Sequence, residues 1–249
     1  MNRFDLRWRK ALDAEGLKEF HANRFWARFN GAPIPEYKDW DRPKCMRFLA
    51  TLLEIIKSHR IFPVSAAVIM QDWAQLSVDE RALLTGAVYK ENSGQLVGAG
   101  APNKVFFFPF VWCVSTPLRY CNPGLVMDFF FDRNEFVATY AQDYYDFLRR
   151  AWTHHPRKMG KLSFVDSEKT SPIQAADLLA YELNRYAKER IKQNMGMPDR
   201  NPSMKIATRN QRGENDCALF NKPGIDNLLK PYRASKTSAS EGGPVACVP

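Results

Sequence analysis

The chain has 249 residues, of which 45% are hydrophobic and 13% are aromatic, so it can build one large packed domain or two small ones. Its 36 Lys and Arg residues exceed its 27 Asp and Glu residues, and the net charge of +9 favours polyanionic partners such as nucleic acid. Its five widely spaced cysteines include no Cys-x-x-Cys pair, which argues against a disulfide framework and against a zinc site. No apolar run reaches the ~18 residues of a membrane span, and the charged start differs from a signal peptide. We therefore expect a cytoplasmic protein without a membrane partner.

The first half of the chain predicts a helix followed by a buried strand. Residues 42–61 carry apolar side chains at helical spacing. Residues 62–70 are short, apolar and rich in β-branched side chains, which is typical of a buried strand. Residues 105–116 are apolar almost throughout, so their pattern leaves helix and strand equally open.

A strand followed by a helix is predicted next. Alternation along residues 125–132 puts Asp128, Phe130 and Asp132 on one face of the strand. A helix over residues 133–151 follows. Asp132 then has two interpretations, because a carboxylate at a strand end can bind a metal ion but can also cap the next helix.

The third predicted strand covers residues 161–166 and leads into a long helix that begins near Pro172. Ser171 and Gln174 suit the N-cap and N3 positions of that helix. Asp166 and Ser167 end the strand, where ligands gather in open α/β sheets, although both residue types also favour turns. The pattern leaves a ligand site and a turn equally open.

Asp177 interrupts residues 173–180, an otherwise nearly apolar stretch that we expect to be mostly buried. A buried carboxylate needs a metal ion or a basic partner, and Asp177 lies past the first helical turn, where the helix dipole stabilises less. Gln174 and Tyr181 share its face. The expected apolar stripe of this helix is Ile173, Ala176, Ala180, Leu183 and Ala187.

A basic run joins the helix over residues 133–151 to the third strand. It suits either phosphate contacts or a solvated connection. Its candidate nucleic-acid-binding residues are Arg149, Arg150, Arg157, Lys158 and Lys161.

The remainder of the sequence adds few chemical signals. His21 has no second histidine at metal-ligand spacing, so a packed histidine is the alternative to a functional one. No phosphate-binding glycine loop, nucleophile elbow or dinucleotide fingerprint is present, so we expect no nucleotide cofactor. Residues 195–233 predict an appended lobe. Residues 234–249 are rich in Ser, Gly and Ala, which predicts a disordered tail.

Four sequence segments, taken in order, resemble the domain-of-unknown-function 3800 family. They are Phe20-His-Ala22, Phe131-Asp132, Phe164-Val-Asp-Ser167 and Ile173-Gln-Ala-Ala-Asp-Leu-Leu-Ala180. Together they span roughly residues 15–192. The most specific feature is an Asp-Ser strand end followed closely by Gln-x-x-Asp on a helix.

The resemblance implies an α/β fold of the ribonuclease H-like kind over residues 1–194, with a mixed sheet flanked by helices. It also implies an acidic cluster of Asp132, Asp166 and Asp177 that binds Mg²⁺ or Mn²⁺. Ser167, Gln174 and His21 would support this cluster. Paired divalent ions in such sites activate water and stabilise the leaving oxygen of a phosphodiester.

The family's opening strand, which ends in Asp-Glu-Ser-Gly, has no counterpart in this sequence, so we expect an N-terminally incomplete domain. Losing that strand would remove a sheet element together with an acidic ligand. The leading hypothesis is a metal-dependent phosphodiesterase or nuclease. The alternative is a catalytically inactive remnant of the fold that binds nucleic acid or a partner.

Overall fold

The computed structural model describes residues 3–59, 64–90, 95–98, 100–122, 124–133, 135–151, 158–193 and 217–240. The chain divides into two compact units, and each is described by itself. Unit 1 comprises residues 1–65, 127–139 and 160–217. Unit 2 comprises residues 66–126, 140–159 and 218–249.

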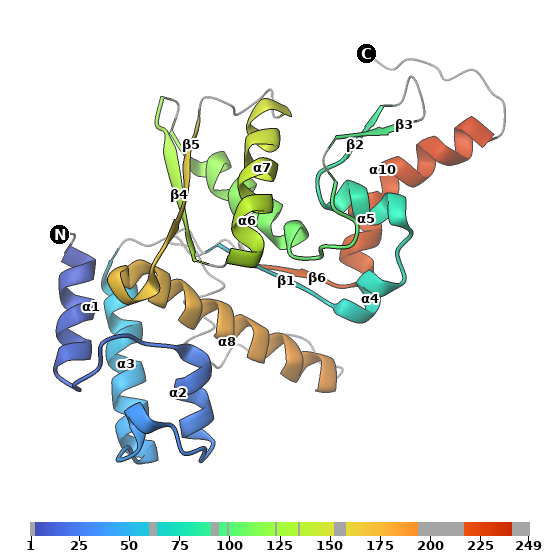
Figure 1. Ribbon diagram of the computed structural model, residues 1–249. Coiled ribbons are helices and arrows are strands. Elements are labelled where there is room, and N and C mark those ends of the chain that lie inside the picture. The colour runs from blue at the N-terminus through green and yellow to red at the C-terminus, as the bar shows by residue number, and fades with distance from the viewer. Residues whose placement is uncertain are drawn as a thin grey trace. The chain divides into compact units, whose positions relative to one another are not determined.

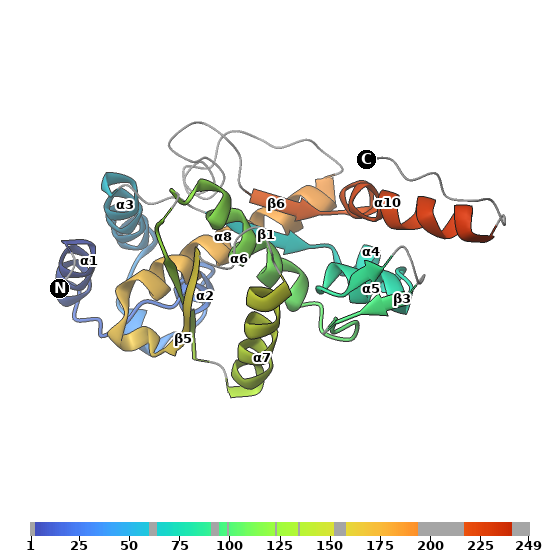
Figure 2. The same cartoon turned by 90° about the horizontal axis from the view of Figure 1, so that it is seen from above.

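Unit 1 is mostly helical. Its elements are α1 (Arg3–Asp13), α2 (Ala22–Phe29), η1 (Pro35–Tyr37), α3 (Arg42–Ser58), β4 (Met127–Asp132), most of β5 (Met159–Val165), η3 (Ser167–Lys169) and α8 (Ser171–Gln193). Helices α1 and α3 lie side by side in both ribbon views (Figures 1 and 2). They are antiparallel, since Arg7 Nη1 donates to Ser58 Oγ at 2.6 Å while Lys44 pairs with Glu15 at 2.9 Å.

The core of unit 1 is rich in aromatic side chains. Trp8, Phe20 and Phe25 are fully buried, and Leu178 of α8 belongs to the same cluster. The helix predicted over residues 42–61 is present as α3, which begins where the Asp41 side chain accepts a hydrogen bond of 2.7 Å from the Lys44 backbone N–H and ends at Ser58. Residues 60 and 61 lie outside the described chain. Burial of these large side chains, at roughly 1.5 to 3 kcal/mol each, is the main stabilising term of this unit.

Strands β4 and β5 form a two-stranded sheet. The Arg133 N–H donates to the Val165 carbonyl at 2.9 Å, and the rings of Phe131 and Phe164 contact each other at 6.3 Å between centroids. Residue numbers therefore rise together along the two strands, which is the signature of parallel pairing. Exposure along β4 alternates as predicted, with Phe129 buried.

Unit 2 combines short strands with longer helices. Its elements are most of β1 (Ser65–Val68), α4 (Met70–Ala74), α5 (Val78–Leu84), β2 (Val88–Lys90), β3 (Gln95–Val97), α6 (Phe107–Tyr120), most of α7 (Glu135–Ala151), most of β6 (Cys217–Phe220) and α10 (Lys222–Ser240). Strands β1 and β6 pair, and β2 pairs with β3 in antiparallel register. Phe108, Phe220, Ile225 and Leu229 belong to its core.

A strand is present within the predicted range 62–70 as β1, but its residues are half-buried and not fully buried as expected, and residues 62 and 63 lie outside the described chain. The apolar segment over residues 105–116 lies largely in helix α6. The mixed α/β class is therefore confirmed. The described residues form three separate two-stranded sheets and not the one central mixed sheet that we expected.

Several predicted boundaries need correction. Helix α7 begins at Glu135, so Asp132 is the last residue of β4 and does not occupy the N-cap position before α7. Helix α10 continues to Ser240, into the tail that we expected to be disordered from residue 234, because this part extends an already formed helix. Residues 241–249 lie outside the described chain. The predicted single domain over residues 1–194 contributes to both compact units.

The described residues contain no helix that is both long enough and apolar enough to cross a membrane.

Candidate functional site

Gln174 joins three parts of unit 1 through its side-chain amide. Its Oε1 accepts hydrogen bonds from Trp8 Nε1 and from the Phe20 backbone N–H, each at 3.0 Å, and its Nε2 donates to the Ser167 carbonyl at 2.7 Å. The side chain is buried, with 2% of its surface exposed. Two of the predicted supporting residues, Ser167 and Gln174, therefore do lie together.

Asp177 lies one turn further along α8 and contacts the start of α2. Its Oδ2 accepts a hydrogen bond of 2.9 Å from the Ala22 N–H, the first residue of α2. Asp177 is exposed, which corrects the expectation of a buried carboxylate. Its partner is a helix N-terminus, whose unpaired N–H groups and dipole favour a negative charge.

The apolar stripe expected on α8 was partly wrong. Ala176 and Ala180 are exposed, whereas Ala175 and Leu178 pack in the core of unit 1. Small alanine side chains gain little from burial, so their presence in a helix does not reveal which face is buried.

His21 occupies the N-cap position of α2 but supplies no side-chain cap. Its Nε2 lies 2.8 Å from Glu19 Oε1, while its backbone carbonyl accepts from the Phe25 N–H at 3.0 Å. The Asp177 carboxylate provides the capping charge that the imidazole does not. His21 and Asp177 therefore both lie at the start of α2, each with its own partner.

Asp166 stabilises the turn that follows β5. It is the N-cap of η3, and its Oδ1 accepts from the Glu168 N–H at 3.0 Å. Its side chain is 41% exposed and lies 3.9 Å from the Lys169 ammonium. The turn that the sequence left open as one alternative for Asp166 and Ser167 is present, and the ligand site stays a prediction.

A second acidic residue, which the sequence did not single out, adjoins this turn. Asp5 on α1 accepts a hydrogen bond from Ser171 Oγ and pairs with Arg9 at 3.2 Å. Arg9 also donates to the Lys169 carbonyl at 2.6 Å. Burial raises the pKa of the Asp5 carboxyl, but hydrogen bonds from Ser171 and Arg9 outweigh burial and hold that pKa below its usual range.

Asp132 does not join the other two aspartates. The hydrogen bond from the Arg133 N–H to the Val165 carbonyl pairs Arg133 with Asp166, and it pairs Asp132 with Val165. Paired residues share a face of the sheet and neighbours along a strand alternate. Asp132 and Asp166 therefore point to opposite faces, although both lie at the same end of the two strands.

The three predicted metal ligands do not fit one metal centre in this arrangement. Asp166 and Asp177 each hold a backbone N–H, and Asp132 faces the other side of the sheet. Within the described residues, no group of three or more His, Cys, Asp or Glu side chains is close enough to bind a metal ion. We therefore derive no reaction step through Mg²⁺ or Mn²⁺.

The predicted basic residues have different surroundings. Arg149 and Arg150 are exposed on the last turn of α7, and the Lys161 side chain is exposed on β5. Lys158 instead donates to the carbonyls of Leu118 and Cys121, at 3.3 and 2.9 Å. A cation at these last carbonyls of α6 stabilises the negative end of the helix dipole, so Lys158 has a structural contact. Arg157 lies outside the described residues.

Two features of interest were missed by sequence reasoning. Glu182 of α8 is fully buried and pairs with Arg185 at 3.1 Å, while the Arg185 guanidinium lies 4.0 Å from the Trp26 ring centre. The sequence did contain a signal that Glu182 is buried, because Glu182 follows Gln174 and Leu178 at helical spacing on the same face of α8. Unit 2 also contains a cleft of about 450 Å³ with mostly apolar walls and Arg119 among its lining residues.

Comparison of the chain with known protein families, with curated proteins and with solved structures gives no match. The resemblance to the domain-of-unknown-function 3800 family stays a prediction that rests on the quoted motifs.

Proposed function

We propose that this chain is a nucleic-acid-binding protein in which the predicted catalytic carboxylates have structural functions. The observation that carries the proposal is the use of Asp166 and Asp177 as hydrogen-bond acceptors for the backbone N–H groups that begin η3 and α2. Carboxylates in these positions stabilise helix ends whether or not a metal is bound.

The charge of the chain supports the binding half of the proposal. A net charge of +9 attracts phosphates, and binding through phosphates releases counterions without requiring chemistry. Arg149 and Arg150 are the strongest candidates in the predicted basic run, because both are exposed side by side on one helical turn. Lys158 is a weaker candidate, because its ammonium already donates to two carbonyls at the end of α6.

The test is a salt titration of binding to a fluorescent duplex DNA and to a matched RNA, measured by anisotropy in EDTA. We expect affinity to survive EDTA and to fall steeply with salt. The double variant Arg149→Ala/Arg150→Ala should lower the slope of log K against log salt by roughly two, because each lost phosphate contact removes about 0.9 on duplex DNA.

The matched control is Lys90→Ala/Lys230→Ala, which removes the same charge from exposed positions in the same unit. It should change the slope less than the arginine pair does. Equal effects of the two double variants would mean that only overall charge matters. No binding at low salt would overturn the proposal.

Catalysis is tested on the same substrates in Mg²⁺ and in Mn²⁺. The variants Asp166→Asn and Asp177→Asn keep an oxygen that can accept the observed N–H bonds, while both lose the charge that a metal ion needs. Cleavage by the natural chain that disappears in these folded variants would replace the present proposal with a metal-dependent phosphodiesterase.

A further inference from the structure

Within the described part of the chain, the edge of β4 that faces away from β5 has no partner strand. A residue's N–H and C=O in a strand point to the same side, and successive residues alternate. Because the Arg133 N–H points to β5, the backbone groups of Asp128, Phe130 and Asp132 point away from it. The strands of unit 1 pair only as β4 with β5 among the described residues, so this edge has no partner strand there.

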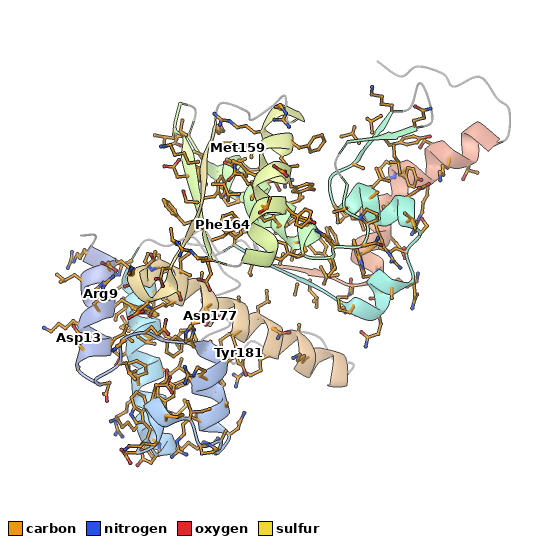
Figure 3. The ribbon with its side chains drawn as sticks, viewed as in Figure 1. Arg9, Asp13, Met159, Phe164, Asp177 and Tyr181 are labelled. Atoms are coloured by element: carbon orange, nitrogen blue, oxygen red, sulfur yellow. The ribbon has the colours of Figure 1, made fainter. Side chains whose placement is uncertain are left out.

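The same three residues expose their side chains. Phe130 is 56% exposed, an unusual state for a phenylalanine at the centre of a strand, and Asp128 and Asp132 on either side of it are exposed as well. Strands β4 and β5 lie next to each other in Figure 1, and Figure 3 labels Phe164 on β5. An open edge that carries an exposed aromatic side chain is a template for pairing with another strand.

We propose that the outer edge of β4 binds an extended segment of a partner protein in which one apolar residue lies between two basic residues at alternate positions. Backbone hydrogen bonds to Asp128, Phe130 and Asp132 would supply the affinity of such a complex. The basic side chains of the partner would pair with the carboxylates of Asp128 and Asp132, and its apolar side chain would cover Phe130. These side-chain contacts would set the specificity.

The charges exclude two other occupants. If β4 of a second copy paired antiparallel about Phe130, Asp128 of each copy would lie opposite Asp132 of the other, and like charges directly opposite each other destabilise a sheet. Nucleic acid is repelled by the same pair of carboxylates. Asp128 keeps its charge exposed even though its Oδ1 accepts from the Lys161 N–H at 2.8 Å.

The experiment uses the full chain and three labelled peptides, with binding followed by fluorescence anisotropy. The first peptide contains Lys-Thr-Val-Thr-Lys, the second has Glu in place of both Lys residues, and the third is the first with N-methyl groups on the amides that would pair. We expect the Lys peptide to bind about tenfold tighter than either of the others. If the methylated peptide bound as tightly as the unmethylated Lys peptide, strand pairing would be overturned. This comparison leaves the protein unaltered.

Two variants test the edge itself. Asp132→Lys should reverse the preference, so that the Glu peptide binds the tighter of the two. Phe130→Pro removes one outward N–H at a position where an edge strand tolerates proline, and it should abolish binding of the Lys peptide. The proposal would be overturned if Asp132→Lys still preferred the Lys peptide, or if Phe130→Pro bound that peptide as tightly as the natural chain. If Phe130→Pro does not fold, Asp132→Lys alone decides.

Discussion

The Asp177 carboxylate on α8 accepts a hydrogen bond of 2.9 Å from the Ala22 N–H at the start of α2. This contact links two segments that lie far apart in the sequence and that were both singled out by the family resemblance. A carboxylate at this point both satisfies an N–H that the helix leaves unpaired and interacts favourably with the positive end of the helix dipole. The motif thus has a sufficient structural explanation.

Removing this acceptor should destabilise unit 1. We expect Asp177→Ala to lower the free energy of unfolding by about 0.5 to 2 kcal/mol, as loss of a helix cap does, and Asp177→Asn to lose less because its amide oxygen still accepts. Urea unfolding followed by tryptophan fluorescence measures both. The control is Asp39→Ala, which removes an exposed carboxylate in the same unit. Equal stability of Asp177→Ala and this control would contradict the capping role.

Gln174 should be more sensitive than Asp177, because it is buried. Gln174→Met keeps the size of the side chain but leaves Trp8 Nε1 and the Phe20 N–H without their acceptor. Each unpaired buried donor costs about 1 to 3 kcal/mol, so we expect a loss of about 2 to 5 kcal/mol in unfolding free energy. Gln142→Met, which removes only a 3.2 Å contact with Asp146, should cost less than about 0.5 kcal/mol.

The elements that the sequence predicted well are those with an unambiguous period or cap. The alternation in β4 and the helical spacing in α3 gave the correct type of element, and exposure along β4 alternates between the two predicted faces. Helix α8 begins at Ser171, within one residue of the predicted start, although Ser171 Oγ is engaged with Asp5. The segment over residues 105–116 stayed ambiguous because a helix that is apolar on all sides has no period to read.

The candidate site was harder to predict, because a local pattern does not reveal which groups meet. Asp166 and Asp132 end neighbouring strands, and only the register between those strands puts them on opposite faces. Asp177 was expected to be buried because residues 173–180 are otherwise nearly all apolar, yet Ala176 and Ala180 in that stretch are exposed. The partner of Asp177 is a backbone N–H of another helix, and no side-chain motif encodes such a partner.

The buried Glu182 and its half-buried partner Arg185 should show strong coupling. Arg185→Met removes a cation 3.1 Å from a fully buried carboxylate and also its contact with Trp26, so we expect a loss of about 2 to 4 kcal/mol. The double variant Glu182→Leu/Arg185→Met removes both charges and should recover at least half of that loss. Additive losses in the denaturant midpoints would show that the two side chains act independently.

Helix α10 should respond to acid through Arg233. Its guanidinium pairs with Glu80 of α5 at 2.7 Å and with Asp226 at 2.7 Å. Burial raises the pKa of Glu80, but hydrogen bonds from Ser77 and Arg233 outweigh it, and the pKa of Glu80 is lowered from 4.5. A hydrogen bond from Arg233 likewise lowers the pKa of Asp226.

A lowered carboxyl pKa stabilises the fold above the unfolded value, and this stabilisation disappears as pH falls through the folded value. Arg233→Gln should therefore lower the melting temperature at pH 7, with a loss of no more than about 1 kcal/mol for the exposed Arg233–Glu80 pair, and should have no effect at about pH 2. Thermal unfolding at both pH values measures the difference, with Lys230→Gln as the control on the same helix. Charge pairing cannot survive protonation of both carboxylates. If Arg233→Gln still lowers the melting temperature in acid, the arginine therefore stabilises α10 through packing of its aliphatic part.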